Sequence, residues 1–428
     1  MIDVRQQRWF GSKSREITHQ EVLERIALDG GIELAILQVG FGEGTHDLYQ
    51  LVLRGDEDAS EDLEFVRALI RNMDAGRDVE TAAGTAVFRG LAGLEPVEHV
   101  RPMGAEQSNT SLVLDERVVL KVYRRLGAGP NPELELLRFL TERGFENIAS
   151  LRGWYAHTGR LIDATLGIAQ DFLPGAVDGW QLALDDLQQE PERFLARAHE
   201  LGVITGRMHS VLASDSQDPA FAPEETSAEA LGLLTATVDE EIEQVFLDLP
   251  GTAAVDPIRG RGQEVRERLA LLTQVGSAGR IIRHHGDYHL GQVMRTEDRW
   301  VVLDFEGEPA RTLVERRRKR SPLRDVAGML RSFAYAATAS ELDHAIAAPE
   351  DWEMRAREGF LDGYLDEVDP SILPPGRAAI ERLLSVFELE KAVYELRYEL
   401  DNRPDWVKIP VAGICRLLEI DDHEEVAR

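Results

Sequence analysis

Hydrophobic and polar residues follow different periods along the chain, and these periods predict where its strands and helices lie. Near the start, apolar runs predict strands at 32–41 and 46–53. Apolar residues at helical spacing then predict helices at 63–73 and 78–94. We therefore expect residues 1–98 to form a small α+β unit.

The next part of the chain has the pattern of a second, mostly β unit. Two apolar runs, 111–114 and 118–123, are separated by a short polar turn and predict a hairpin. A helix is predicted at 133–143 and a further strand at 166–172. We expect this unit to comprise residues 99–178.

The remainder, residues 179–428, has mostly helical periodicity. Long helices are predicted at 191–212 and 228–247. A short hairpin is predicted within 293–304, where two apolar runs flank polar residues. The mixture of helices and strands places the chain in the α+β class.

The charge balance narrows the classes of partner. The 428 residues include 48 basic and 77 acidic side chains, a net charge of -29. Such a chain repels nucleic acid and anionic membranes as a whole.

The absence of a long apolar run and of an apolar leader predicts a cytoplasmic protein. Cys415 is the only cysteine, which excludes an intrachain disulfide framework.

The strongest chemical signal lies around the predicted hairpin at 293–304. Asp287 lies five residues before Gln292, and Asp304 lies 17 residues after Asp287. Kinase-like enzymes space their base, an amide metal ligand and a metal-binding aspartate in this way. We therefore predict a phosphotransferase in which Asp287 is the base and Gln292 and Asp304 bind Mg²⁺.

A lysine in the second unit has the position of a phosphate-binding residue. Lys121 follows the apolar residues 118–120, as the kinase lysine does in its strand. It would contact the α- and β-phosphates of a nucleotide while paired with a helix carboxylate. We place Glu135 first and Glu133 second as that partner. A surface ion pair on an edge strand is the alternative.

The segment before Lys121 lacks the glycine-rich pattern of a phosphate-covering loop. In its place stand polar residues that include Ser108, Asn109 and Thr110. Their side chains and backbone N–H groups can contact phosphates. A polar hairpin turn explains the same residues almost as well, so both interpretations stay open.

Aromatic and charged residues recur at helical spacing near the C-terminus. We take Tyr394, Glu395, Tyr398 and Trp406 as candidate substrate residues, because rings stack on sugar faces and carboxylates bond hydroxyl groups. A core stripe is the alternative. The basic run 315–320 is interpreted as a solvated loop rather than an anion site.

Four segments together resemble the actinobacterial maltokinases: 106–111, 285–292, 304–309 and 325–333. The resemblance extends nearly from end to end of the chain. It implies a bilobal protein-kinase-like fold, of the aminoglycoside phosphotransferase type, with an N-terminal cap subdomain. Residues 1–98 would then be the cap, followed by a nucleotide-binding small lobe and a helical lobe.

The resemblance also implies the reaction. The enzyme would use ATP and Mg²⁺ to phosphorylate maltose at its anomeric hydroxyl, giving maltose 1-phosphate for α-glucan synthesis from trehalose. By position, Asp287 would be the catalytic aspartate. Gln170 and Phe172 would belong to the hinge that holds adenine through its backbone. Association with a trehalose-isomerising enzyme stays open.

Two alternatives remain at this point. One is a kinase of an amino sugar such as glucosamine, or of an aminoglycoside-like acceptor, because the fold serves many alcohols. The other is an inactive kinase-like binding module. The presence of Lys121, Asp287, Gln292 and Asp304 together argues against an inactive module, since such a module has no chemical need for all of them.

Overall fold

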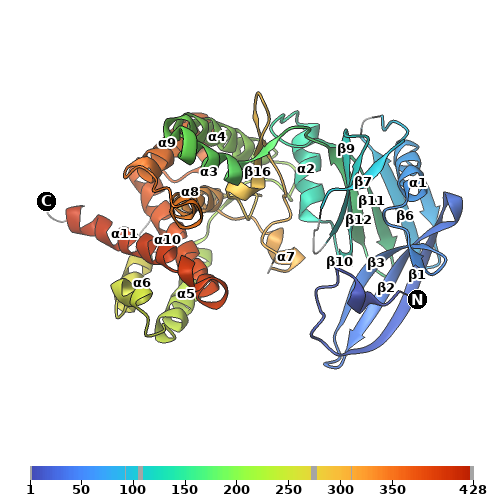
Figure 1. The fold of residues 1–428 in the computed structure, drawn as a ribbon, viewed down its shortest axis with the longest axis horizontal. Coiled ribbons are helices and arrows are strands. Elements are labelled where there is room, and N and C mark those ends of the chain that lie inside the picture. Colours follow the sequence, from blue (N-terminus) through green and yellow to red (C-terminus); the bar gives the residue numbers. More distant parts are fainter. Residues whose placement is uncertain (1, 92, 105–108, 271–276, 310, 425–428) are drawn as a thin grey trace. The chain divides into compact units, whose positions relative to one another are not determined.

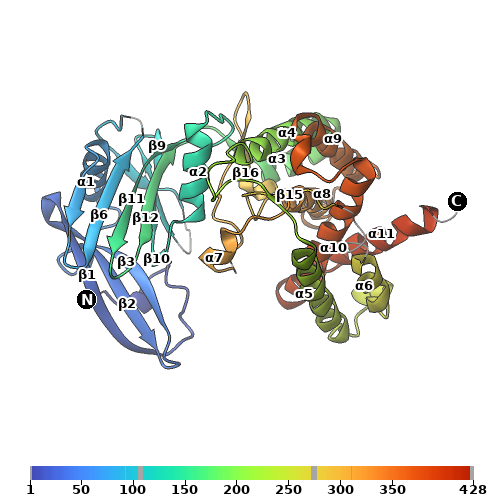
Figure 2. The ribbon, with the colours of Figure 1, turned by 180° about the vertical axis from the view of Figure 1, so that it is seen from behind.

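The computed structural model forms two compact units, shown in Figures 1 and 2. The first unit comprises residues 1–176 and 309–316, and the second comprises 177–308 and 317–428. The residues that the structure describes are 2–91, 93–104, 109–270, 277–309 and 311–424.

The first unit begins with an antiparallel sheet in the order β1-β2-β3-β10, with β4 paired to β3. Its strands are β1 Ile17–Leu28, β2 Ile32–Phe41, β3 His46–Arg54, β4 Glu57–Asp58 and β10 Arg125–Leu126. The strands predicted at 32–41 and 46–53 are therefore confirmed. One face is covered by the N-terminal segment, whose Trp9 and Phe10 rings lie 5.6 and 5.3 Å from the ring of Tyr49.

A seven-stranded antiparallel sheet forms the rest of this unit, in the order β5-β6-β11-β12-β9-β8-β7. Its strands are β5 Asp78–Glu80, β6 Gly84–Gly90, β7 Val100–Pro102, β8 Asn109–Leu114, β9 Val118–Tyr123, β11 Leu151–Gly159 and β12 Ala164–Asp171. The helices of the unit are η1 Val4–Gln6, η2 Asp29–Gly31, α1 Leu63–Asp74, α2 Pro132–Glu142 and α7 Leu313–Arg316.

The helix predicted at 78–94 is wrong, because β5 and β6 occupy this segment. Strand β6 pairs with β11 along its whole length, from Gly84 opposite Gly159 to Gly90 opposite Gly153. Threonine, valine and phenylalanine in β6 suit a pleated, half-buried surface. Part of the predicted cap thus belongs to the sheet that carries Lys121. The division of the chain at residues 98 and 178 stays a prediction.

The second unit is mostly helical. Its α-helices are α3 Gly179–Gln189, α4 Pro191–Leu212, α5 Ala228–Leu247, α6 Gly262–Ala270, α8 Leu323–His344, α9 Trp352–Glu367, α10 Arg377–Asn402 and α11 Lys408–Glu424. The short helices are η3 Ala253–Ile258, η5 Leu290–Gln292, η6 Pro370–Ile372 and η7 Pro404–Trp406, and the strands are β13 Val177–Asp178, β14 Glu224–Glu225, β15 Arg280–Ile281, β16 Val293–Arg295 and β17 Trp300–Val302. The helices predicted at 191–212 and 228–247 are confirmed.

Helices α4 and α9 lie side by side in both views (Figures 1 and 2) and approach each other closely. At Gly206 of α4, an added Cβ would lie 2.6 Å from the backbone oxygen of Tyr364 in α9. Only glycine therefore permits this approach. The contact fixes the C-terminal half of α4 against α9.

Buried ion pairs connect α8, α9 and α10. Arg331 of α8 is fully buried, and its Nη2 lies 2.7 Å from Oε2 of Glu395 in α10. Nη2 of Arg357 in α9 lies 2.8 Å from Oε1 of Glu388, which comes about two helical turns before Glu395 in α10. Each buried carboxylate is thus neutralised by a guanidinium group, which burial in a low-dielectric interior requires.

Part of the basic run 315–320 has a structural role that the solvated-loop interpretation missed. The Nζ of Lys319 donates hydrogen bonds of 2.7 Å to the backbone oxygens of Pro219 and Ala222. The backbone of Arg320 exchanges hydrogen bonds with Ile282. These contacts fasten the polar segment that follows α4 onto the second unit.

Among the described residues, none of the helices has the length and apolarity that a membrane crossing requires.

Candidate active site

The hairpin β16–β17 brings Gln292 and Asp304 to the same end of two paired strands. Val293 pairs with Val302, and Leu303 N–H donates a 2.9 Å hydrogen bond to the backbone oxygen of Gln292. The sequence spacing between these two residues therefore has a local cause. One tight hairpin positions both, and the loop with Asp287 leads directly into it.

His285 supports the loop that carries Asp287. Its Nε2 lies 2.8 Å from the backbone oxygen of Leu303, so the ring donates there. Its Nδ1 then accepts the N–H of Asp287 at 3.3 Å. The ring also packs against Phe305 and Tyr288, with centroids 5.0 and 5.2 Å away. These contacts brace the loop on both sides of the ring.

A buried aspartate outside the motif of Asp287, Gln292 and Asp304 holds the backbone of the same loop. Asp325, in the first turn of α8, accepts the N–H of His285 at 2.7 Å and that of Gly286 at 2.9 Å. It also lies 3.1 Å from Nε2 of His209 in α4. The sequence marks it only as the first residue of the segment 325–333, one of those that resemble the maltokinases.

The electrostatics of this cluster keep Asp325 ionised. Burial alone would raise the pKa of Asp325, but neighbouring histidines and the His209 hydrogen bond outweigh burial and hold that pKa below its ordinary value. Burial lowers the pKa of His284 to about 4, so His284 is neutral near pH 7. The hydrogen bonds that Asp325 accepts also favour its ionised form.

The loop after β17 has strained backbone at its predicted metal ligand. Asp304 adopts a φ of 57°, which a residue with a side chain rarely adopts outside a constrained site. Gly286 and Gly307 have φ of 87° and 73°. A Cβ on Gly286 would lie 3.5 Å from Cα of Gly307, so the Asp287 loop and the Asp304 loop run close together.

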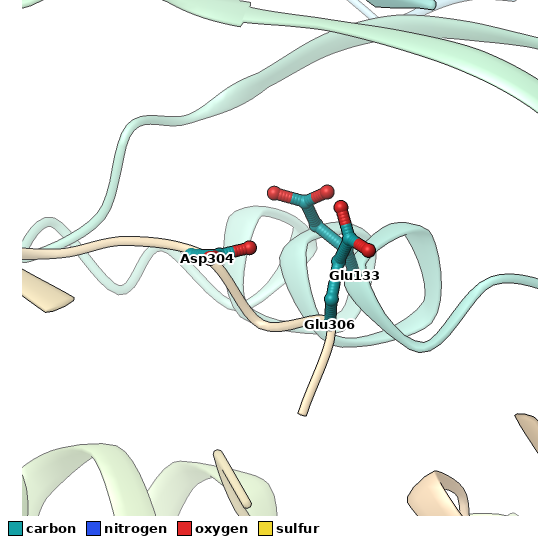
Figure 3. A group of neighbouring side chains, drawn as sticks. All are labelled: Glu133, Asp304 and Glu306. Atoms are coloured by element: carbon teal, nitrogen blue, oxygen red, sulfur yellow. The ribbon is translucent and has the colours of Figure 1, made fainter. Parts of the chain in front are cut away.

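Carboxylates on this loop fit a divalent cation. One carboxylate oxygen each of Asp304 and Glu306 lies within 4.8 Å of the other. Figure 3 shows both side chains on the loop after β17. Mg²⁺ prefers such oxygen ligands and retains waters for its remaining positions. Sequence reasoning proposed Asp304 and Gln292 for this role and missed Glu306.

Lys121 forms an ion pair with a helix carboxylate in the first unit, and that carboxylate is Glu133. Lys121 Nζ lies 3.0 Å from Oε2 of Glu133, and both side chains are buried. The hydroxyl of Tyr123 donates to the same oxygen at 2.6 Å. This corrects our first choice, Glu135. Helix α2 begins at Pro132, so Glu133 faces the sheet and Glu135 lies about 200° further around the helix.

The predicted phosphate segment is only partly described. Ser108 lies outside the described residues. Asn109 and Thr110 begin β8 and pair with Tyr123 and Val122 of β9. The hydroxyl of Thr110 accepts a 2.8 Å hydrogen bond from Nε of Arg124, which is itself buried. The structure therefore places Asn109 and Thr110 on the strand beside Lys121.

The predicted hinge is the end of β12. Gln170 is paired on both sides of that strand, with Leu151 and Val119. The N–H of Phe172 donates a 2.8 Å hydrogen bond to the backbone oxygen of Arg117. That donor is therefore engaged within the protein, and the role of this segment in holding adenine through its backbone stays a prediction.

Helix α10 presents a lysine and two tyrosines on one face. Lys391 Nζ lies 3.8 Å from Oδ1 of Asp287, while Tyr394 and Tyr398 are nearly half exposed. Burial, together with the charge of Glu308, raises the pKa of Tyr394, so its phenol stays neutral and keeps an O–H donor. This face offers aromatic surface and hydrogen-bond donors beside the predicted base.

The other two candidate substrate residues have structural contacts. Glu395 is buried and pairs with Arg331, so it is not available to a sugar, and the prediction for it is corrected. It follows Tyr394 directly in α10 and therefore points about 100° away from it. Trp406 stacks on Tyr335 with centroids 6.2 Å apart, and the guanidinium of Arg403 lies 4.7 Å from the Trp406 ring centroid.

Comparison with known protein families also indicates a phosphotransferase. Residues 99–361 match the phosphotransferase enzyme family, and residues 4–85 match the maltokinase N-terminal cap domain. The chain belongs to the phosphotransferase enzyme family. Its resemblance to the maltokinases is thereby supported at the level of the cap domain and the family.

Two curated relatives resemble the chain along most of its length. They are glucosamine kinases from Streptacidiphilus jiangxiensis and Mycolicibacterium smegmatis, each 27% identical. The first match covers 78% of this chain and 76% of its relative, and the second covers 74% and 79%. These identities support a phosphotransferase and leave the acceptor of this member of the family undecided.

The fold is shared with solved structures. A glucosamine kinase in complex with glucosamine, ADP and inorganic phosphate matches with a TM-score of 0.78 and 23% identity, over 96% of both chains. A second crystal form of glucosamine kinase gives a TM-score of 0.77 at 23% identity, over 94% of both chains. The predicted fold class, a protein-kinase-like α+β fold with an N-terminal cap, is confirmed.

Proposed function

We propose that this phosphotransferase is an ATP-dependent sugar kinase that phosphorylates the anomeric hydroxyl of maltose. The observation that carries the choice of acceptor is the ammonium group of Lys391, 3.8 Å from the carboxylate of Asp287. The maltokinase-type cap at residues 4–85 supports the same choice. ATP and Mg²⁺ are the cofactors.

The roles of the catalytic residues follow from the chemistry of phosphoryl transfer. Asp287 accepts the proton of the attacking sugar hydroxyl, while the γ-phosphoryl group passes from ATP to that oxygen and ADP leaves. Asp304, Glu306 and Gln292 would hold Mg²⁺, which neutralises charge on the phosphates when bound. Lys121, fixed by Glu133, would contact the α- and β-phosphates.

The charge beside Asp287 favours a neutral acceptor. An ammonium group on the acceptor would meet the ammonium of Lys391, and like charges in a partly exposed site repel by about 1 kcal/mol. A neutral disaccharide meets no such penalty. It can stack on Tyr394 and Tyr398 and accept hydrogen bonds from Lys391.

Glucosamine is the second candidate. The relatives that cover about three quarters of the chain are glucosamine kinases. Glu308, whose charge acts on Tyr394, is a carboxylate that an amino sugar could use. Maltose is neutral and glucosamine carries an ammonium group. The opposite charges of Lys391 and Glu308 therefore determine which of the two acceptors the site favours. Formation of maltose 1-phosphate would place the enzyme before α-glucan synthesis, where association with a trehalose-isomerising partner remains a prediction.

A coupled assay of ADP release tests the acceptor. The purified protein is supplied with ATP, Mg²⁺ and, in turn, maltose, glucose, glucosamine or an aminoglycoside. We expect the highest kcat/KM with maltose. Turnover of glucosamine without turnover of maltose would replace the first candidate by the second. Failure with every acceptor would argue for the inactive binding module.

Substitution of Lys391 by glutamine tests the charge argument. The change removes the ammonium group beside Asp287 and keeps a hydrogen-bonding side chain of similar reach. We expect the ratio of kcat/KM for glucosamine to kcat/KM for maltose to rise about tenfold. Lys408→Gln is the matched control, because Lys408 is exposed and lies 3.6 Å from Glu341. An unchanged ratio in Lys391→Gln would remove Lys391 as the basis of acceptor choice.

A further inference from the structure

Residues 309–316 belong to the first unit, although the chain on both sides of them belongs to the second. This segment contains the short helix α7. It directly follows residues 304–308, the metal loop, which begins with the predicted ligand Asp304. We propose that Leu313 of α7 is a positioning residue, which couples the metal loop to the helix that carries Glu133.

Leu313 occupies the space beside a glycine of the first unit. A Cβ added to Gly127 would lie 2.0 Å from Cδ1 and 3.0 Å from Cγ of Leu313. No side chain therefore fits at position 127 while Leu313 keeps its place. The φ of Gly127 is not positive, so its backbone conformation is open to other residues. The close approach of Leu313 is what requires glycine here.

The loop that receives Leu313 leads to the ion pair of Lys121. Gly127 follows β10 directly, and Asn131 is the N-cap residue of α2. The side chain of Asn131 accepts the N–H of Glu133 at 2.8 Å, which fixes the start of the helix. Three residues of chain separate Gly127 from this cap. A displacement at Gly127 is therefore transmitted to the carboxylate that pairs with Lys121.

Hydrogen bonds within the segment hold its shape independently of the Leu313 side chain. The carboxylate of Glu315 accepts the N–H of Thr312 at 2.9 Å and its hydroxyl at 2.8 Å, as in a capping box. Nε of Arg316 donates a 2.9 Å hydrogen bond to the backbone oxygen of Arg311. Truncation of Leu313 therefore keeps this turn and removes its contact with the loop before α2.

The chain is held within the second unit on both sides of this segment. After it, Lys319 and Arg320 make the hydrogen bonds described above. Before it, Leu303 is hydrogen-bonded to the backbone of Gln292. Docking of Leu313 therefore restricts the conformations open to the metal loop. A cation that orders the loop would favour docking, and docking would strengthen cation binding to the same extent, because such coupling is reciprocal.

Equilibrium binding of ATP, with Mg²⁺ or with a chelator, tests this coupling. In Leu313→Ala we expect the Kd for ATP with Mg²⁺ to rise about tenfold. The Kd for ATP with the chelator should change less than about twofold, because the variant acts through the metal loop. A purely structural role of Leu313 would raise both Kd values alike. Leu313 is only partly buried, so the variant is expected to fold.

Gly127→Ala tests the same contact from its other side. The added methyl group displaces Leu313, so the Kd for ATP with Mg²⁺ should rise about as much as in Leu313→Ala. In the double variant Gly127→Ala with Leu313→Ala the space is free again. We therefore expect the double variant to bind ATP no more weakly than Leu313→Ala alone. Additive losses in the double variant would contradict a shared contact.

Val314→Ala and Gly11→Ala are the matched controls. Val314 follows Leu313 in α7 and is 66% exposed, and a Cβ on Gly11 would meet nothing within 4 Å. Both controls should bind ATP as the wild-type protein does.

Two results would contradict different parts of this account, because the coupling rests on the metal role given under the proposed function. If Mg²⁺ tightens ATP binding equally in the wild-type protein and in Leu313→Ala, the role of Leu313 is overturned. If Mg²⁺ has no effect on ATP binding in the wild-type protein, the metal assignment itself is wrong, and the coupling falls with it.

Discussion

Asp287→Asn is expected to lower kcat about a thousandfold, because the amide cannot accept the proton of the attacking hydroxyl. The change keeps the size of the side chain, and the N–H that bonds to His285 belongs to the backbone. The Kd for ATP should therefore change little. Steady-state turnover and equilibrium nucleotide binding, measured on the same preparation, test both parts.

Asp298→Asn is the control for this result. Asp298 lies in the turn of the same hairpin, where its carboxylate accepts a 2.8 Å hydrogen bond from the hydroxyl of Thr296. It is exposed, and it belongs to the turn of the hairpin rather than to the loop that carries the base. We expect wild-type turnover for it. Residual activity in Asp287→Asn near that of Asp298→Asn would contradict the role of Asp287 as base.

Glu395→Ala is expected to destabilise the second unit by about 3–5 kcal/mol, because it leaves the buried guanidinium of Arg331 without its carboxylate. The measurement is the free energy of unfolding by denaturant. Replacing both residues, as in Arg331→Met with Glu395→Leu, should recover much of this loss. Glu381→Ala, which removes an exposed partner of Arg377, should change the melting temperature little.

The same variant separates a structural role of Glu395 from the sugar-binding role that its sequence position suggests. If Glu395 bonded the acceptor, Glu395→Ala would raise the KM for the sugar and leave stability nearly unchanged. The buried contact with Arg331 predicts the opposite pattern, in which stability falls and the KM of the folded fraction is retained.

The chemistry of the site could be predicted where it depends on residues close in sequence. Asp287, Gln292 and Asp304 lie on one loop and one hairpin, so their spacing along the chain is also their arrangement in space. Lys121 was found for the same reason, because a single apolar strand carries it. These assignments depend on local backbone geometry, which spacing and composition report well.

The wrong predictions concern residues whose structure depends on segments that are distant in the sequence. The alanines of 78–94 favoured a helix, yet pairing with β11 made this segment two strands. The choice between Glu133 and Glu135 depended on where α2 begins relative to the sheet. The sequence favours a substrate role for Glu395 because it does not show Arg331 of α8 beside it.

The residues that sequence reasoning missed share this origin. Asp325 and His209 are separated from each other and from Asp287 by long stretches of chain, and only the packing of α4, α8 and α9 brings them together. No distinctive pattern surrounds His209, and the segment that begins at Asp325 does not show which groups the carboxylate contacts. Their roles became visible through hydrogen bonds to the backbone of the loop.

The most direct test of the central claim is the identity of the product. The purified protein is incubated with ATP, Mg²⁺ and maltose, and the reaction is followed by phosphorus-31 NMR. We predict a new phosphomonoester resonance, split by the anomeric proton of the sugar, that grows as ADP forms. A phosphate ester that forms only in a matched reaction with glucosamine, or ADP accompanied solely by inorganic phosphate, would contradict the proposed function.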